Sequence, residues 1–123
     1  MKLIWETRRQ FVVARYVAEH QQLLFRSDKG MGGETRMEIL FGPVRHMNLG
    51  CLIYEQFNLY SMSPEELAEH SGGLCLNPPS SFSLYGIGGT ETEVQGVIVA
   101  SGYSSTEDDG DYWEPSGLLR FDS

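Results

Sequence analysis

The chain has 123 residues, of which 41% are hydrophobic, 11% aromatic and 21% charged, and it carries a formal net charge of −8. That length suits one domain with its own core, and the apolar fraction is too high for a disordered chain. A negative surface repels phosphate backbones, so direct nucleic-acid binding is disfavoured. We therefore expect residues 1–123 to form a single folded domain.

Three segments in the first part of the chain have the composition of β-strands. Residues 10–18 and 21–27 are rich in Val, Phe, Tyr and Leu, and residues 35–41 alternate between apolar and charged side chains. Residues 28–33 contain several glycines, which permit the positive φ angles of a tight connection. This pattern predicts an antiparallel hairpin between 21–27 and 35–41, with Arg26 near Glu38.

The alternation in residues 35–41 also predicts which side chains are buried. Met37, Ile39 and Phe41 fall on one face of the strand, whereas Arg36 and Glu38 fall on the other. We expect the three apolar side chains to lie in the core and the two charged ones to point away from it.

Further strands are expected later in the chain. Residues 44–49 suggest a short strand, and residues 52–60 are ambiguous between strand and helix, although their aromatic content favours a strand. Residues 80–87 and 94–103 are predicted to form a second hairpin around the glycines at 88 and 89.

One helix is signalled clearly, at residues 63–70. Ser63 can accept from the first free amides, Pro64 suits the first helical position, and Glu66 completes a capping box. The glycines at 72 and 73 mark its end.

Five to seven strands, one short helix near 63–70 and no alternation of strands with helices predict an α+β fold that is mainly antiparallel β-sheet. A curved half-barrel is one form that such a sheet can take. Residues 104–123 are polar and acidic, and we expect them to be an irregular C-terminal segment of the same domain.

The sequence indicates a cytoplasmic protein. Residues 7–13 resemble the twin-arginine export motif, but Arg15 and Glu19 soon interrupt the apolar stretch that an export signal needs. The arginines at 8 and 9 are therefore expected on the surface of a strand. No uncharged run approaches the ~18 apolar residues of a membrane span.

The two cysteines, Cys51 and Cys75, both lie in apolar runs. In a reducing compartment we expect them to be reduced and buried. Without a CxxC motif or a third cysteine, a thiolate zinc site is disfavoured.

No pattern in the sequence amounts to a catalytic, cofactor or metal site. Glu66 and His70 stand one helical turn apart, but a catalytic zinc needs a third protein ligand. Neither a GxSxG elbow nor a phosphate-binding loop is present. We expect no cofactor and no metal, and an enzyme remains an alternative through a cleft that contains Arg36, Glu38 or His46.

Charge is distributed unevenly along the chain. Residues 1–46 contain eight of the nine Lys and Arg residues and have a net charge of +3, whereas residues 47–123 have a net charge of −11. Such asymmetry is typical of a surface that binds a charged partner, although folding can intermix the two halves. A basic protein is the partner that these charges favour.

The densest feature is the acidic segment, residues 107–114, which holds five carboxylates and two large aromatic side chains. Its spacing does not fit a calcium loop. Tyr and Trp are favoured anchors at protein interfaces, and the carboxylates would select a basic partner. The predicted partner-binding residues are Glu107, Asp108, Asp109, Asp111, Tyr112 and Trp113.

Several stretches resemble a pattern in small bacterial proteins of unassigned function. They are Leu23–Ser27, Thr35–Phe41, Val44-Arg45, Glu107–Tyr112, Pro115-Ser116 and Leu118. The resemblance implies a bacterial, intracellular origin and no catalytic residues.

The favoured hypothesis is a non-enzymatic acidic binding protein, similar to an inhibitor or immunity protein, that covers a basic protein partner. One alternative is a mimic of nucleic acid that blocks a DNA-binding protein. Another is a β-rich domain that encloses a small apolar ligand in a pocket, which would be lined by Phe11, Tyr16, Phe25, Phe41 and Tyr54.

Overall fold

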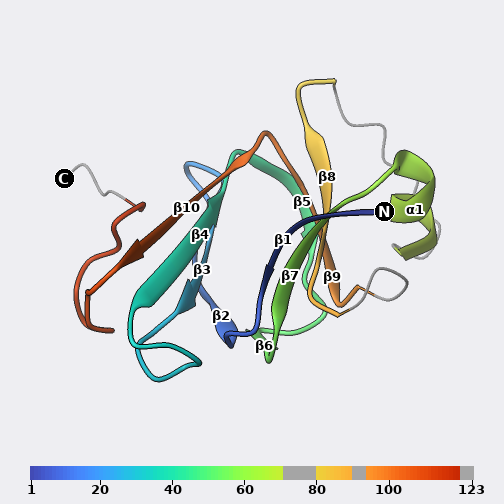
Figure 1. The fold of residues 1–123 in the computed structure, drawn as a ribbon. Helices are drawn as coiled ribbons and strands as arrows, with labels where there is room; N and C mark the ends of the chain where they lie inside the picture. Colours follow the sequence, from blue (N-terminus) through green and yellow to red (C-terminus); the bar gives the residue numbers. More distant parts are fainter. Residues whose placement is uncertain (71–79, 90–93, 120–123) are drawn as a thin grey trace.

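Two five-stranded antiparallel sheets and one short helix make up the computed structural model, which describes residues 1–70, 80–89 and 94–119 (Figure 1). Sheet I contains, from edge to edge, β1 (Lys2–Thr7), β7 (Phe57–Ser61), β8 (Ser83–Ile87), β9 (Gly96–Ala100) and β5 (Val44–Asn48). Sheet II contains β10 (Tyr103–Asp108), β4 (Arg36–Phe41), β3 (Gln22–Ser27), β2 (Phe11–Val17) and β6 (Ile53–Tyr54). The helix, α1, spans Pro64–His70.

The two sheets are joined at a corner where two neighbouring connections bend together. The chain passes from β4 to β5 through Gly42-Pro43, and from β9 to β10 through Ser101-Gly102. The Gly42 amide donates to the Gly102 carbonyl at 3.1 Å, and the Ser101 amide donates to the Pro43 carbonyl at 2.9 Å. Strands that change sheets at such bends allow two sheets to enclose one core.

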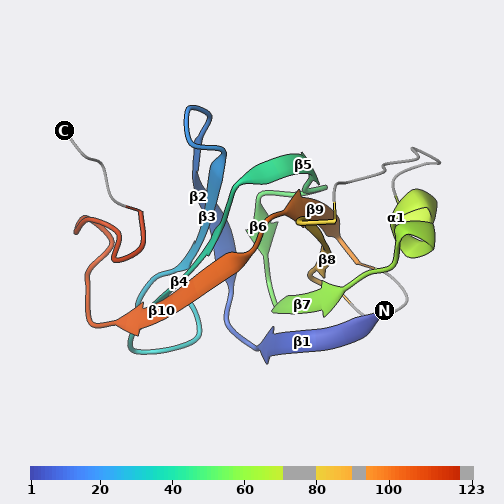
Figure 2. The same cartoon turned by 90° about the horizontal axis from the view of Figure 1, so that it is seen from above.

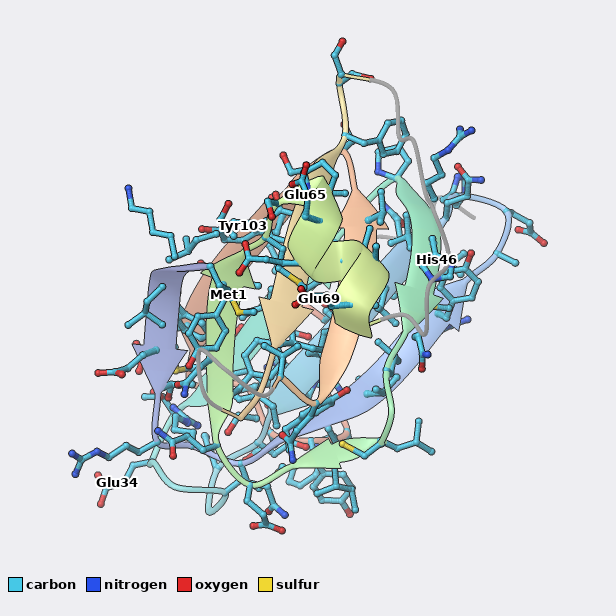
Figure 3. The ribbon with its side chains drawn as sticks, turned by 90° about the vertical axis from the view of Figure 1, so that its right-hand side faces the viewer. Met1, Glu34, His46, Glu65, Glu69 and Tyr103 are labelled. Carbon is cyan, nitrogen blue, oxygen red and sulfur yellow. The ribbon has the colours of Figure 1, made fainter. Side chains whose placement is uncertain are left out.

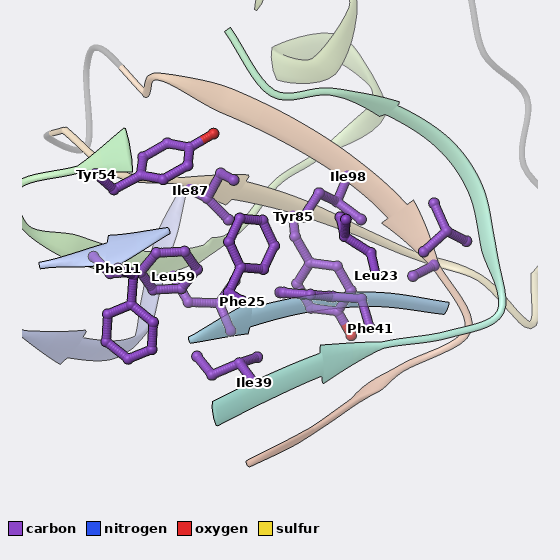
Figure 4. Packing of buried hydrophobic residues seen from close by; sticks show 13 residues of the cluster. Phe11, Leu23, Phe25, Ile39, Phe41, Tyr54, Leu59, Tyr85, Ile87 and Ile98 are labelled. Carbon is purple, nitrogen blue, oxygen red and sulfur yellow. The ribbon is translucent and has the colours of Figure 1, made fainter. Parts of the chain in front are cut away.

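The main hydrophobic cluster lies between the sheets and is rich in aromatic side chains (Figure 4). Phe57 of β7 packs against Phe11 and Phe25 of sheet II, with ring centroids 4.9 and 5.1 Å apart. Tilted and edge-on arrangements of this kind stabilise a core beyond the area that the rings bury.

A second cluster lies on the other face of sheet I, beneath α1. Leu67 of the helix packs there with Leu84, Val97 and Val99. Figure 3 shows α1 over this face, with Glu65 and Glu69 on the helix and Met1 nearby.

The capping box of α1 is present as predicted. The Ser63 amide donates to the Glu66 carboxylate at 3.0 Å, and the Glu66 amide donates to the Ser63 hydroxyl at 3.2 Å. The Met1 ammonium group also contacts Glu66, at 2.7 Å. The bonds from this ammonium group and from the Ser63 amide lower the pKa of Glu66 to about 2.

The predicted fold class and the predicted elements are confirmed in their main lines. The 21–41 hairpin forms, and Arg26 lies opposite Glu38 in its register. The second hairpin is the β8–β9 pair, and residues 52–60 contain strands rather than a helix. The described residues, however, form ten strands rather than five to seven.

Three predictions need correction. Residues 104–108, expected to be irregular, belong to strand β10, because β4 supplies a partner for their backbone. Arg9, expected on the surface, is buried and donates to Ser27 and Thr35. Cys51 is a free thiol that is half-buried rather than buried, while Cys75 lies outside the described residues.

Within the described part of the chain, no helix is long and apolar enough to cross a membrane. The single helix there, α1, has seven residues, against the ~20 that a bilayer requires.

Candidate functional site

The acidic segment begins at the end of β10 and continues over sheet II. Figure 2 shows the chain after β10 on the side of sheet II that faces away from sheet I. Residues 109–119 contain no helix or strand, and side chains of β4 hold several of their backbone groups. The same face of the sheet carries Arg36 and Glu38 of β4.

Arg36 is the main anchor of this segment. Its Nε and Nη2 atoms donate to the two carboxylate oxygens of Asp108, each at 2.9 Å. Its Nη1 and Nη2 atoms donate further to the carbonyls of Glu114, at 3.0 Å, and Pro115, at 3.1 Å. Nη1 also reaches the Asp111 carbonyl, at 3.4 Å. The planar guanidinium thus ties one carboxylate and three carbonyls together, a geometry that a lysine ammonium does not offer.

Glu38 is the second anchor. One carboxylate oxygen accepts two bonds from Arg26, at 3.0 and 3.2 Å, and the other accepts the Gly117 amide at 2.8 Å. Glu38 is fully buried, so these three donors replace the water that its charge would otherwise need.

The loop between β3 and β4 supplies two further contacts. The Thr35 hydroxyl donates to Glu107, and the Lys29 ammonium lies 3.3 Å from the Asp111 carboxylate. The loop and the acidic segment therefore contact each other, although they are far apart in the sequence.

The expected orientation of two side chains is confirmed, but their burial was not predicted. Arg36 and Glu38 do point away from the core between the sheets, but they are covered rather than solvated, and Arg36 is 3% exposed. The covering layer is the segment after β10, which lies on the outer face of sheet II.

The electrostatics of the anchor follow from its geometry. The bonds from Arg36 hold the pKa of Asp108 below its usual range, although partial burial opposes this effect. The same bonds raise the pKa of Arg36. Both groups are therefore charged at neutral pH and stabilise each other's charge.

The predicted partner-binding residues divide into two sets. Asp108 is held by Arg36, Glu107 by Thr35, and Asp111 by Lys29, so these three stabilise the fold of the segment. The other three face solvent: Asp109, Tyr112 and Trp113.

Tyr112 and Trp113 form an exposed aromatic pair. Their rings meet edge to face, with centroids 5.0 Å apart and planes at 87°. Tyr112 is 70% exposed and Trp113 is 68% exposed. Large aromatic side chains on a surface are typical of contact sites, because burying them against a partner removes much apolar area from water.

Sequence reasoning missed the residues that hold this surface in place, namely Arg36, Glu38, Lys29 and Thr35. A signal was available in the charge distribution, because a segment with five carboxylates and no local cation needs positive charge from elsewhere. Arg36 and Lys29, both from the basic first part of the chain, provide it.

The alternative enzyme hypothesis placed Arg36, Glu38 or His46 in a cleft, and the structure puts these residues on two different sheets. Arg36 and Glu38 lie on the outer face of sheet II, whereas His46 lies on β5 of sheet I. Among the described residues, no three His, Cys, Asp or Glu side chains are grouped so as to hold a metal ion.

The aromatic residues proposed for an apolar pocket have two different environments. Phe11, Phe25, Phe41 and Tyr54 are fully buried, whereas Tyr16 is exposed. Phe25 contacts both Phe41 and Tyr54 edge to face, with centroids 5.7 and 5.9 Å away.

A depression of about 400 Å³ lies instead at the corner between the sheets. Its lining includes Gln22, Leu40, Pro43 and Tyr103. His20, Ser101 and Ser104 also line the depression, so its wall mixes titratable, polar and apolar groups.

No protein-family model matches the chain, and no curated protein or solved structure matches it at a significant level.

Proposed function

We propose that this protein is a non-catalytic binding module whose acidic segment is the contact surface for a basic protein partner. The observation that carries the proposal is the exposed Tyr112–Trp113 pair, displayed on a segment that Arg36 anchors. Aromatic anchors ringed by polar groups are typical of the residues that dominate binding energy at interfaces.

Anchoring favours binding because it lowers the entropy lost when a partner docks. Arg36 holds the carbonyls of Asp111, Glu114 and Pro115, which flank the aromatic pair on both sides. The backbone that carries Tyr112 and Trp113 is thus largely ordered before any partner arrives. A loop ordered in advance binds more tightly than a flexible one with the same contacts.

The charges around the pair favour a basic partner. Asp109 and Glu114 are exposed on the same segment as the aromatic pair, and the segment holds more carboxylates than the nearby cations neutralise. Such a field accelerates encounter with a positive surface and repels a negative one. The proposed partner is a protein with a basic site, of the kind that inhibitors and immunity proteins bind and cover.

Nucleic-acid mimicry uses the same electrostatics and is the rival interpretation. The aromatic pair favours a specific protein contact over mimicry, because a phosphate backbone has no equivalent of two large apolar rings.

The test is affinity capture from the source cells with three forms of the protein: wild type, Trp113→Ala and Leu52→Ala. Leu52 is the matched control because its exposed fraction, 67%, is close to the 68% of Trp113, and because it lies outside the acidic segment. We expect a basic protein to be captured by wild type and by Leu52→Ala, to be lost with Trp113→Ala, and to be weakened by high salt. Equal capture by all three forms would place the interface elsewhere.

A further inference from the structure

Strand β10 leaves one edge of sheet II open. All six of its residues pair in regular antiparallel register with β4, from Tyr103 opposite Phe41 to Asp108 opposite Arg36. Within the described residues, β4 is the only strand that pairs with β10, which stands at the end of the strand order. Half of its backbone amides and carbonyls therefore point outward from the open edge, away from any strand partner among the described residues.

Most of the usual protections of an open edge are missing from β10. Natural edge strands avoid unwanted pairing by means of bulges, prolines or charged side chains, most often lysines. β10 has no bulge, proline or lysine, its two charged residues stand at its end, and its middle residues are the small side chains Ser104, Ser105 and Thr106. The opposite case is edge strand β1, which begins with Lys2 and has a shift of register between Leu3 and Trp5.

The two ends of β10 indicate which strand it would accept. At its start, Tyr103 is part exposed and packs on Phe41 and Tyr85, which offers an apolar contact. Glu107 lies near its end and Asp109 directly after it, and both are exposed. A second copy of β10 would bring further carboxylates and no Lys or Arg, so a second copy is disfavoured. A cationic strand is favoured by the same charges.

We infer that an extended, basic segment of the partner protein adds to β10 as a sixth strand of sheet II. This inference rests on the proposed function, because the acidic segment that follows β10 selects the partner. Main-chain hydrogen bonds along β10 would hold the segment, and the acidic segment would contact its cationic side chains. This is the mode of recognition in which a peptide extends an exposed sheet edge.

The test uses a synthetic peptide, Lys-Val-Lys-Val-Lys-Val, with blocked ends, and amide hydrogen exchange read by NMR. The control peptide has the same sequence and charge but carries N-methyl groups on its two central residues, which removes one donor from each of its edges. At a peptide concentration about ten times the dissociation constant, the outward amides of β10 should exchange about tenfold more slowly. The outward amides of β1 serve as an internal control and should not change.

The outcomes separate strand addition from the proposed function. If the methylated peptide protects β10 equally well, or if neither peptide protects it at millimolar concentration, strand addition is overturned and the proposed function still stands on the capture test. Protection of β1 instead of β10 also overturns it. The peptide should still protect β10 in Trp113→Ala, because main-chain pairing does not use that side chain. Loss of partner capture by this variant therefore tests the proposed function and not strand addition.

Discussion

Arg36 and Asp108 face each other as the last register pair between β4 and β10, joined by two hydrogen bonds of 2.9 Å. The pair marks the point where the chain leaves the sheet and turns over its outer face. Arg36 also donates to the carbonyls of Glu114 and Pro115. The same side chain therefore contacts the end of strand β10 and the segment that covers the sheet. The partner surface proposed above depends on this arginine, although Arg36 itself is hidden from any partner.

Replacing Arg36 should destabilise the protein substantially. We expect Arg36→Ala to lower the free energy of unfolding by about 3 kcal/mol, the lower end of the range for a broken buried ion pair. The lower end applies because Asp108 is 32% exposed, so water can solvate the carboxylate that is left behind. Chemical denaturation measures the change. Arg8→Ala, at an exposed arginine, should change stability by less than about 0.5 kcal/mol, and equal stability of the two variants would contradict the anchoring role of Arg36.

The ion pair should also make stability depend on pH in the acid range. An unfolded aspartate titrates near pH 4, whereas Arg36 lowers the pKa of Asp108 in the folded protein. The pair therefore stabilises the fold fully above about pH 4, and this stability is lost as pH falls through the lower, folded pKa. Urea denaturation at several pH values should show the difference between wild type and Asp108→Asn shrinking on acidification. Glu66, whose pKa is lowered to about 2, titrates in both proteins and so cancels in the difference. A difference that stays constant down to pH 2 would show that the Asp108 charge contributes nothing.

Local signals in the sequence predicted the elements that are stabilised locally. The capping box of α1 needs only Ser63 and Glu66, three residues apart, and its two reciprocal bonds form as expected. The β3–β4 hairpin is similar, because a glycine-containing loop joins two strands that are close in sequence.

Elements stabilised by distant partners were not predictable in this way. The sequence of β10 is mostly small and polar, and it is a strand because β4, about seventy residues earlier in the chain, offers it a ladder. The residues that bury Arg36 belong to a segment equally distant in the sequence. The alternation in β4 therefore predicted the direction of the Arg36 side chain but not its burial. The acidic residues of the candidate site could be identified, but their division into anchored and free groups required the three-dimensional structure.

The core assignment of β4 gives a prediction with an internal control. Ile39 is fully buried in the cluster between the sheets, so Ile39→Ala should cost about 2–5 kcal/mol of stability. Ile53→Ala removes the same atoms from an exposed side chain and should cost far less. Thermal or chemical denaturation of the two variants compares them directly. Similar denaturation midpoints for the two variants would show that Ile39 does not lie in the core.

The last prediction separates charge from aromatic contact in partner binding. Asp108 is unsuitable for this test, because neutralising it would loosen the anchor as well as change the field. Asp109 is exposed on the same segment, so Asp109→Asn changes the charge and leaves the Arg36 contacts in place. With purified partner, surface plasmon resonance should show slower association for Asp109→Asn and a weaker dependence of that rate on salt.

Trp113→Ala should act on the other rate constant. Loss of an aromatic anchor shortens the life of a complex, so dissociation should quicken by a factor equivalent to about 2 kcal/mol or more. Stability should hardly change, since Trp113 is mostly exposed in the free protein. Leu52→Ala, a similarly exposed apolar residue outside the segment, should leave both rate constants at their wild-type values. If Asp109→Asn and Trp113→Ala bind as wild type does, the acidic segment only covers sheet II and the partner surface lies on another part of the molecule.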